Sequence, residues 1–352
     1  MTRRPVRRRA LRPAMSAALA LALLTGGAVA SADAQPLDAA ETTSSTEASG
    51  SVLRTKAFTK DVSKAPLHPN SRAMVQNLDH QVTSRYGGVA AFNAYKYNVS
   101  LATASSSQKR VDVRFTDCQR KGYTPKSLYG PQGHFEDVPI PADAIPAGGS
   151  DGQLTVYSPS EDRLWEFWKA QKTSSGWSAC WGGRVDKASQ SQGYFPDGMG
   201  ASASGLAVSQ GAVRVQEAQA RRIDHALTLA IPTIGHWKDW SYPAQRSDGS
   251  DKSSSAIPMG TRFRLDPSLD VESLHLHPVA EAIAVAVQKY GFIVSDRSGA
   301  VAVSAESGDA VQAKTGKNPW KATLGGTPSY SVMEGFPWDR LQALPEDWGK
   351  PS

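Results

Sequence analysis

The chain has 352 residues, with 39 Lys and Arg against 33 Asp and Glu. Six of the arginines lie within residues 1–32, which contain no acidic residue, so the rest of the chain is electrically neutral. A role in binding nucleic acid or an anionic membrane is therefore not supported by net charge.

Residues 1–32 have the pattern of a secretory signal peptide. An arginine-rich start precedes the apolar run Ala17–Ala30, and Ala30-Ser31-Ala32 is a small-x-small cleavage site. The apolar run is too short for a mature membrane anchor. We expect a secreted, extracellular protein with no membrane span after leader cleavage. Arg8-Arg9 resembles a twin-arginine signal only loosely, so the Sec and Tat routes both stay open.

Residues 33–65 are rich in Ala, Ser, Thr and acidic residues, a composition typical of a disordered linker or pro-segment. We expect one domain over residues 66–352, and a monomer. The two cysteines, Cys118 and Cys180, are expected to form a disulfide because an exported chain is oxidised outside the cell.

The ordered part begins with helical spacing over residues 71–86, followed by alternating stretches at 97–101 and 111–115. The clearest local pattern is a β-meander with strands over 153–158, 163–172 and 177–184. A short helix is expected over 213–222.

A central strand follows, in which Leu227, Leu229 and Ile231 alternate with small residues until Pro232 ends it. Residues 262–267 make a short extended piece. Pro278 and Gly291 bound the best helix of the chain. Residues 292–295 and 300–305 are expected to form a hairpin. This succession predicts a mainly β fold, a single β-sandwich or jelly-roll domain with a few decorating helices.

Ionisable residues supply the candidate catalytic groups. Asp224-His225 begins the central strand, where His225 is a candidate general acid or base. The alternative is that Asp224 pairs with a neighbouring arginine and His225 is a buried core histidine. Glycosidic cleavage needs two facing carboxyl groups. Glu136, Asp137 and Glu166 are the further candidates.

Aromatic and polar residues supply the candidate binding groups. Six of the nine tryptophans lie between Trp165 and Trp240. Trp237 and Trp240, in a polar loop, are candidates for stacking on sugar rings, although core packing is the commoner role of such side chains. Arg246 and Asp248 are candidate substrate-binding residues. No metal site and no cofactor are expected, since the chain has no complete ligand motif or phosphate-binding glycine loop.

Five segments of the sequence together resemble an uncharacterised family of secreted actinobacterial proteins. They are 164–168, 222–227, 243–249, 257–267 and 336–342. The resemblance covers roughly residues 125–345. It implies a secreted domain with a shared scaffold and transfers no catalytic assignment.

The sequence therefore favours a secreted carbohydrate-active protein whose partner is an extracellular or cell-wall polysaccharide. If it is an enzyme, a glycoside hydrolase or polysaccharide lyase is expected. The alternative is a non-catalytic carbohydrate-binding or structural protein of the cell envelope.

Overall fold

The computed structural model describes residues 54–351. Over this range the chain is a mixed α/β protein with 13 strands in three sheets. The expected leader, 1–32, and residues 33–53 of the expected linker lie outside the described residues. None of the helices in the described range combines the length and the apolar character needed to cross a membrane.

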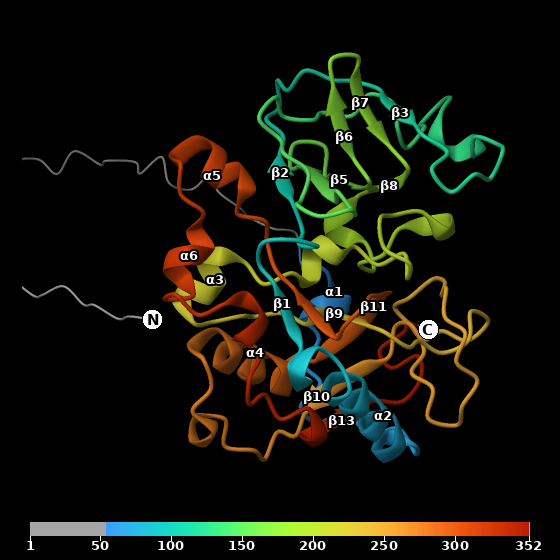
Figure 1. Cartoon of the computed structure of the whole chain (residues 1–352). Helices are drawn as coiled ribbons and strands as arrows, with labels where there is room; N and C mark the ends of the chain where they lie inside the picture. Colours follow the sequence, from blue (N-terminus) through green and yellow to red (C-terminus); the bar gives the residue numbers. More distant parts are fainter. Residues whose placement is uncertain (1–53, 352) are drawn as a thin grey trace, which may run out of the picture. The chain divides into compact units, whose positions relative to one another are not determined.

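The largest sheet has the strand order β1-β12-β9-β11-β10-β13. Figure 1 labels all of these strands except β12. Its members are β1 (Ala91–Asn93), β12 (Ala302–Ser304), β9 (Leu227–Ile231), β11 (Phe292–Arg297), β10 (Arg262–Leu265) and β13 (Leu341–Ala343). The predicted central strand is confirmed as β9, which pairs in parallel with β11 and antiparallel with β12. The predicted hairpin of β11 with β12 is wrong, because β9 lies between them.

Two helices share the hydrophobic core of this sheet, α2 (Ser71–Thr83) and α4 (Pro278–Lys289). Leu227, Leu229 and Ile231 of β9 are buried in the same core. Both helices were predicted from their apolar spacing. The Nδ1 atom of His277 accepts the backbone N–H of Val279 at 3.2 Å and so caps the start of α4.

The other two sheets are smaller. One has the order β2-β4-β5-β8 and the other β3-β7-β6. Their strands are β2 (Leu101–Thr103), β4 (Leu154–Ser158), β5 (Arg163–Trp168), β8 (Trp181–Asp186), β3 (Val113–Phe115), β7 (Gly176–Ala179) and β6 (Gln171–Thr173). The expected strand over 163–172 stops at Trp168, because Lys169 has a positive φ of 53°. The chain then forms a separate hairpin, β6–β7.

A β-sandwich or jelly roll is not confirmed. Four strand pairs are parallel: β1 with β12, β2 with β4, β3 with β7 and β9 with β11. A jelly roll consists of antiparallel Greek keys. The described residues also include four short helices, α1 (Lys56–Thr59), α3 (Val215–Ala220), α5 (Asp309–Thr315) and α6 (Pro319–Thr323).

The predicted disulfide is confirmed. Cys118 and Cys180 are bonded, with their Cα atoms 5.6 Å apart. Cys118 follows β3, and Cys180 lies between β7 and β8. The bond therefore joins the chain just before β8 to the loop that leaves β3.

Residues 54–65 are ordered, although their composition predicted a linker. Phe58 of α1 is fully buried. The guanidinium groups of Arg262 and Arg264, both on β10, donate hydrogen bonds to the carbonyls of Ala57 and Val62 at 2.8 and 2.7 Å. Composition missed this segment because its ordering comes from a strand about 200 residues later in the chain.

Candidate functional site

A cleft of about 1070 Å³ opens over four neighbouring strands of the large sheet. Strand residues alternate between the two faces. Val301, Val303, Leu229 and Ile231 point to the core, whereas the cleft face carries small and polar residues. These are Ala91, Asn93, Ala230, Ser295, Ala302 and Ser304. The small side chains leave room for a ligand above the sheet.

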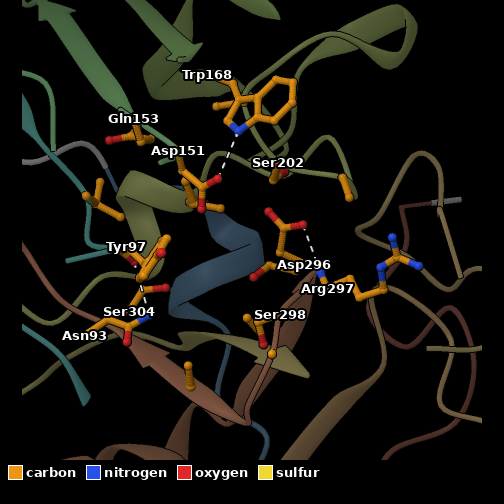
Figure 2. A pocket seen from close by; sticks show the side chains of 18 of the residues that line it. Asn93, Tyr97, Asp151, Gln153, Trp168, Ser202, Asp296, Arg297, Ser298 and Ser304 are labelled. Carbon is orange, nitrogen blue, oxygen red and sulfur yellow. Dashed lines mark hydrogen bonds between the residues drawn. The ribbon is translucent and has the colours of Figure 1, made fainter. Parts of the chain in front are cut away.

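The opposite wall includes residues of the four-stranded sheet, among them Trp168 (Figure 2). Trp168 of β5 and Trp181 of β8 are cross-strand partners, and both line the cleft. The indole N–H of Trp168 donates to Asp151 Oδ1 at 3.2 Å. This contact holds a carboxyl group beside an aromatic surface.

A glycine-rich segment completes this wall. Ala201, Ser202 and Ala203 line the cleft. A Cβ on Gly183 would lie 2.6 Å from the backbone nitrogen of Gly200, so the two backbones can approach only because residue 183 lacks a side chain. The glycine-rich segment therefore packs closely against β8 at this point.

Asp296 is the most perturbed carboxyl group of the cleft. The register of β11 against β9 shifts between Val294 and Asp296, and such a bulge redirects side chains. Ser295 and Asp296 consequently both line the cleft. Burial raises the pKa of Asp296 to about 7, against a hydrogen bond from the Arg297 backbone N–H at 2.9 Å that lowers it. The carboxylates of Asp248 and Asp151 raise the pKa further.

Both expected polar binding residues, Arg246 and Asp248, line this cleft. Arg246 Nη2 donates to the Ser202 carbonyl at 2.6 Å, and its Nε atom is buried with no partner among the described residues. Asp248 pairs with Arg297 at 3.8 Å. The structure therefore brings these two residues together with Asp296. The sequence predicted that Asp296 lies in the turn between the hairpin strands 292–295 and 300–305.

Three tyrosines, Tyr86, Tyr97 and Tyr330, line the cleft with exposed side chains. Tyr86 and Tyr97 have positive φ values of 46° and 54°. Aromatic residues rarely adopt this conformation, and residues held in it often lie at ligand-binding sites. The cleft thus has aromatic surfaces on its rim as well as on its wall.

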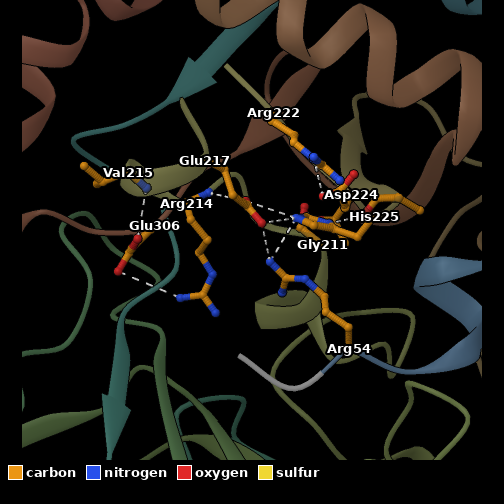
Figure 3. Close-up of polar contacts among 11 residues, drawn as sticks. Arg54, Gly211, Arg214, Val215, Glu217, Arg222, Asp224, His225 and Glu306 are labelled. Carbon is orange, nitrogen blue, oxygen red and sulfur yellow. Dashed lines mark hydrogen bonds and ion pairs between the residues drawn. The ribbon is translucent and has the colours of Figure 1, made fainter. Parts of the chain in front are cut away.

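His225 and Asp224 do not line the cleft. His225 is buried, with Nε2 at 3.0 Å from Glu217 Oε1 and 2.9 Å from Arg54 Nη2 (Figure 3). Its Nδ1 atom is 2.8 Å from the Ala226 carbonyl oxygen. Asp224 is exposed and accepts a hydrogen bond from Arg222 Nε at 2.7 Å. This arrangement matches the alternative of a paired aspartate and a buried core histidine.

Glu217 is the centre of this closed network. Burial alone would raise its pKa, but the hydrogen bond and charge of His225, the charge of Arg54 and the Arg214 backbone N–H outweigh burial and lower the pKa to about 2. Burial, as the largest influence, lowers the pKa of His225. The network therefore ties α3, β9 and the N-terminal segment together.

Glu166 is fully buried in β5 and also lies outside the cleft. Its Oε1 atom accepts the backbone N–H of Ser209 at 2.9 Å, and Oε2 has no partner among the described residues. Burial raises the pKa of Glu166 to about 7. Because Glu166 is buried outside the cleft, a ligand in the cleft does not contact its carboxyl group, and Glu166 is a poor candidate for catalysis.

The other expected site residues are also elsewhere. Asp137 is exposed and pairs with Arg110 at 3.2 Å, and Glu136 is half-buried beside it. Trp237 and Trp240 are 55% and 46% exposed and do not line the cleft. Lys238 lies over the Trp237 ring at 5.1 Å. Both tryptophans are therefore exposed outside the cleft.

Asp151, Asp296, Trp168 and Trp181 were missed as site residues. The signal for Trp168 was present, because aromatic residues occupy both faces of the strand that contains it. No local signal identifies Asp296, since its orientation depends on pairing with β9. Within residues 54–351, no group of three or more His, Cys, Asp or Glu side chains is placed to hold a metal ion.

Comparison with known proteins identifies no relative of this chain. No family model, no curated protein and no solved structure matches the chain. The resemblance to secreted actinobacterial proteins therefore stays a prediction, and functional arguments depend on the cleft itself.

Proposed function

We propose that the cleft binds an extracellular or cell-wall polysaccharide and that Asp296 acts as a general acid in cleaving its glycosidic bonds. The observation that carries this proposal is one carboxyl group, Asp296, on the floor of an aromatic-lined cleft with Asp151 on the opposite wall. Figure 2 shows both side chains directed into the cleft. Two carboxyl groups that flank the scissile bond are what such cleavage requires.

The two carboxyl groups receive different roles. A carboxyl with a pKa of about 7 holds a proton near neutral pH and can donate it to the glycosidic oxygen as the bond breaks. Asp151, held by the Trp168 indole N–H, then either attacks the anomeric carbon or activates a water molecule. Aromatic faces at Trp168 and the rim tyrosines would support the sugar rings.

The test is Asp296→Asn, assayed for release of reducing ends from a panel of polysaccharides. We expect the rate to fall by roughly 10²–10⁴, the usual contribution of a general acid, while binding persists. In the wild type, cleavage should decline as pH rises through about 7, because Asp296 then loses its proton. Asp224→Asn is the matched control, because Asp224 is exposed and outside the cleft. Full cleavage by Asp296→Asn would rule out the assigned acid.

The second candidate is a non-catalytic carbohydrate-binding protein. The three exposed rim tyrosines favour it, since stacking surfaces are sufficient for binding. Under this alternative, the pure wild-type protein binds a glycan that remains intact after long incubation. Asp296→Asn would then change affinity without any change in the glycan pool.

A further inference from the structure

The disulfide brings a charged side chain to the wall of the cleft. Cys118 is bonded to Cys180, and the next residue, Trp181, lines the cleft together with Lys121 of the Cys118 loop. The Lys121 ammonium lies over the Trp181 ring, 4.1 Å from its centroid. A cation at this distance is attracted by the indole face. The loop and the tryptophan therefore hold the ammonium group in a defined place.

This ammonium has no carboxylate partner within salt-bridge distance among the described residues. The nearest acidic residue in the loop is Asp117. Its two carboxylate oxygens accept the backbone N–H groups of Lys121 and Gly122 at 2.8 and 2.7 Å. The carboxylate of Asp117 thus closes the loop through backbone N–H groups, and the Lys121 ammonium lies over Trp181 at the wall of the cleft.

A second lysine provides a comparison within the same sheet. Lys169 lies over Trp168, with 4.7 Å between its Nζ atom and the ring centroid, but Lys169 does not line the cleft. Trp168 and Trp181 are cross-strand partners. Of the two lysine–tryptophan pairs, only the one at Lys121 presents its cation to a ligand.

The other charged residues that line the cleft are Asp151, Arg246, Asp248, Asp296 and Arg297. Arg297 pairs with Asp248, and the Trp168 indole N–H donates to Asp151. Arg246 donates to a backbone carbonyl and keeps a buried Nε–H without a partner among the described residues. Among the described residues, Lys121 and Arg246 are therefore two positively charged groups with no carboxylate within salt-bridge distance, and the charges of Asp296 and Asp248 act on Arg246 from further away.

We propose that Lys121 and Arg246 recognise a negatively charged group on the sugar, so that the ligand of this cleft is an acidic glycan. This inference rests on the proposed carbohydrate function and narrows its substrate class. Carboxylate and sulfate groups both fit, since each accepts charge-assisted hydrogen bonds from ammonium and guanidinium groups.

The experiment measures binding of three oligosaccharides by calorimetry: one with uronate residues, one with sulfate esters on a neutral backbone, and its unsubstituted neutral counterpart. We expect at least one acidic ligand to bind roughly tenfold or more tightly than the neutral one, with affinity that falls as salt rises. Lys121→Met should remove most of that preference. Lys169→Met is the matched control and should preserve it.

Each outcome has a separate meaning. Equal affinity for neutral and acidic ligands, or an acidic preference that survives Lys121→Met, overturns the inference and leaves the proposed function intact. Failure of the wild type to bind any oligosaccharide overturns both. An acidic preference lost equally in Lys121→Met and Lys169→Met also overturns the inference, because the effect would then not come from the cleft.

Discussion

The cleft around Asp296 and the network around Glu217 contain similar residue types in opposite settings. In the cleft, Asp296 and Arg246 line an open volume, and the buried Nε–H of Arg246 has no partner among the described residues. In the network, Glu217 is contacted by both His225 and Arg54. The cleft keeps polar groups available to a ligand, whereas the network uses them to join segments that are distant in the sequence. A cluster of charges therefore indicates a site only when its partners are not already supplied by the protein.

Glu217→Gln should have the largest effect on the free energy of unfolding. It should also distinguish the role of the network from that of the cleft. Removing one charge from a buried ion pair leaves its partners uncompensated, so we expect a loss of roughly 2–4 kcal/mol in the free energy of unfolding. Urea denaturation at pH 7 measures this loss. Ligand affinity of the folded protein should remain unchanged.

The control for this substitution lies in the same segment. Asp224→Asn breaks an exposed pair with Arg222, and because solvent screens such pairs we expect a much smaller loss of stability than in Glu217→Gln. Equal losses from the two substitutions would contradict a stabilising role for the network. Because the pKa of Glu217 is about 2, below its ordinary 4.5, its stabilisation should be complete above pH 4.5 and disappear as pH falls toward 2.

Glu166→Gln should give the next largest change in the free energy of unfolding, and this change should be an increase. The pKa of Glu166 is about 7 in the folded protein, above its ordinary 4.5. The stability that its proton provides is therefore complete below pH 4.5 and is lost as pH rises through 7. Gln keeps the shape without ionising, so we expect a gain of about 1–3 kcal/mol at pH 8.

Thermal unfolding of wild type and Glu166→Gln across pH 5–8 would measure this gain. The two curves should converge near pH 5, where the wild-type carboxyl is protonated. A variant that is no more stable at pH 8 would show that the folded protein accommodates the charged form. Cleavage should be unaffected, in contrast with the loss expected for Asp296→Asn, although both carboxyl groups have a pKa of about 7.

The smallest effect is expected for Trp237→Ser and Trp240→Ser. Both side chains are exposed outside the cleft, so the free energy of unfolding should change by at most about 0.5 kcal/mol. Affinity for a cleft ligand should change less than about twofold. Trp168→Ser, inside the cleft, is the comparison and should weaken binding. A strong loss from the Trp237 loop would place the sugar site there instead.

Local patterns in the sequence predicted those parts of the fold that depend on local chemistry. Apolar spacing was sufficient to predict α2 and α4, and alternation was sufficient to predict β9. The disulfide was predicted because the chain has only two cysteines. Strand order was not predictable, because the insertion of β9 between β11 and β12 depends on pairing across more than 60 residues. The sheet arrangement therefore differs from the expected jelly roll.

The site was predicted less well than the fold for a related reason. Arg246 and Asp248 were identified from a polar loop, and both line the cleft. Asp296 was interpreted as part of a turn because its neighbours, Arg297, Ser298 and Gly299, favour turns. Its exposure to the cleft results from a bulge, which depends on the partner strand and leaves no local signature.

The N-terminal segment has a practical consequence for preparing this protein. A chain that started at Pro66, where the composition suggests the domain begins, would lack both Arg54 and the fully buried Phe58. It would leave Glu217 without Arg54, and Arg262 without the Ala57 carbonyl. Recombinant versions should therefore begin at or before Arg54, and maturation by a protease is compatible with this fold only upstream of that residue.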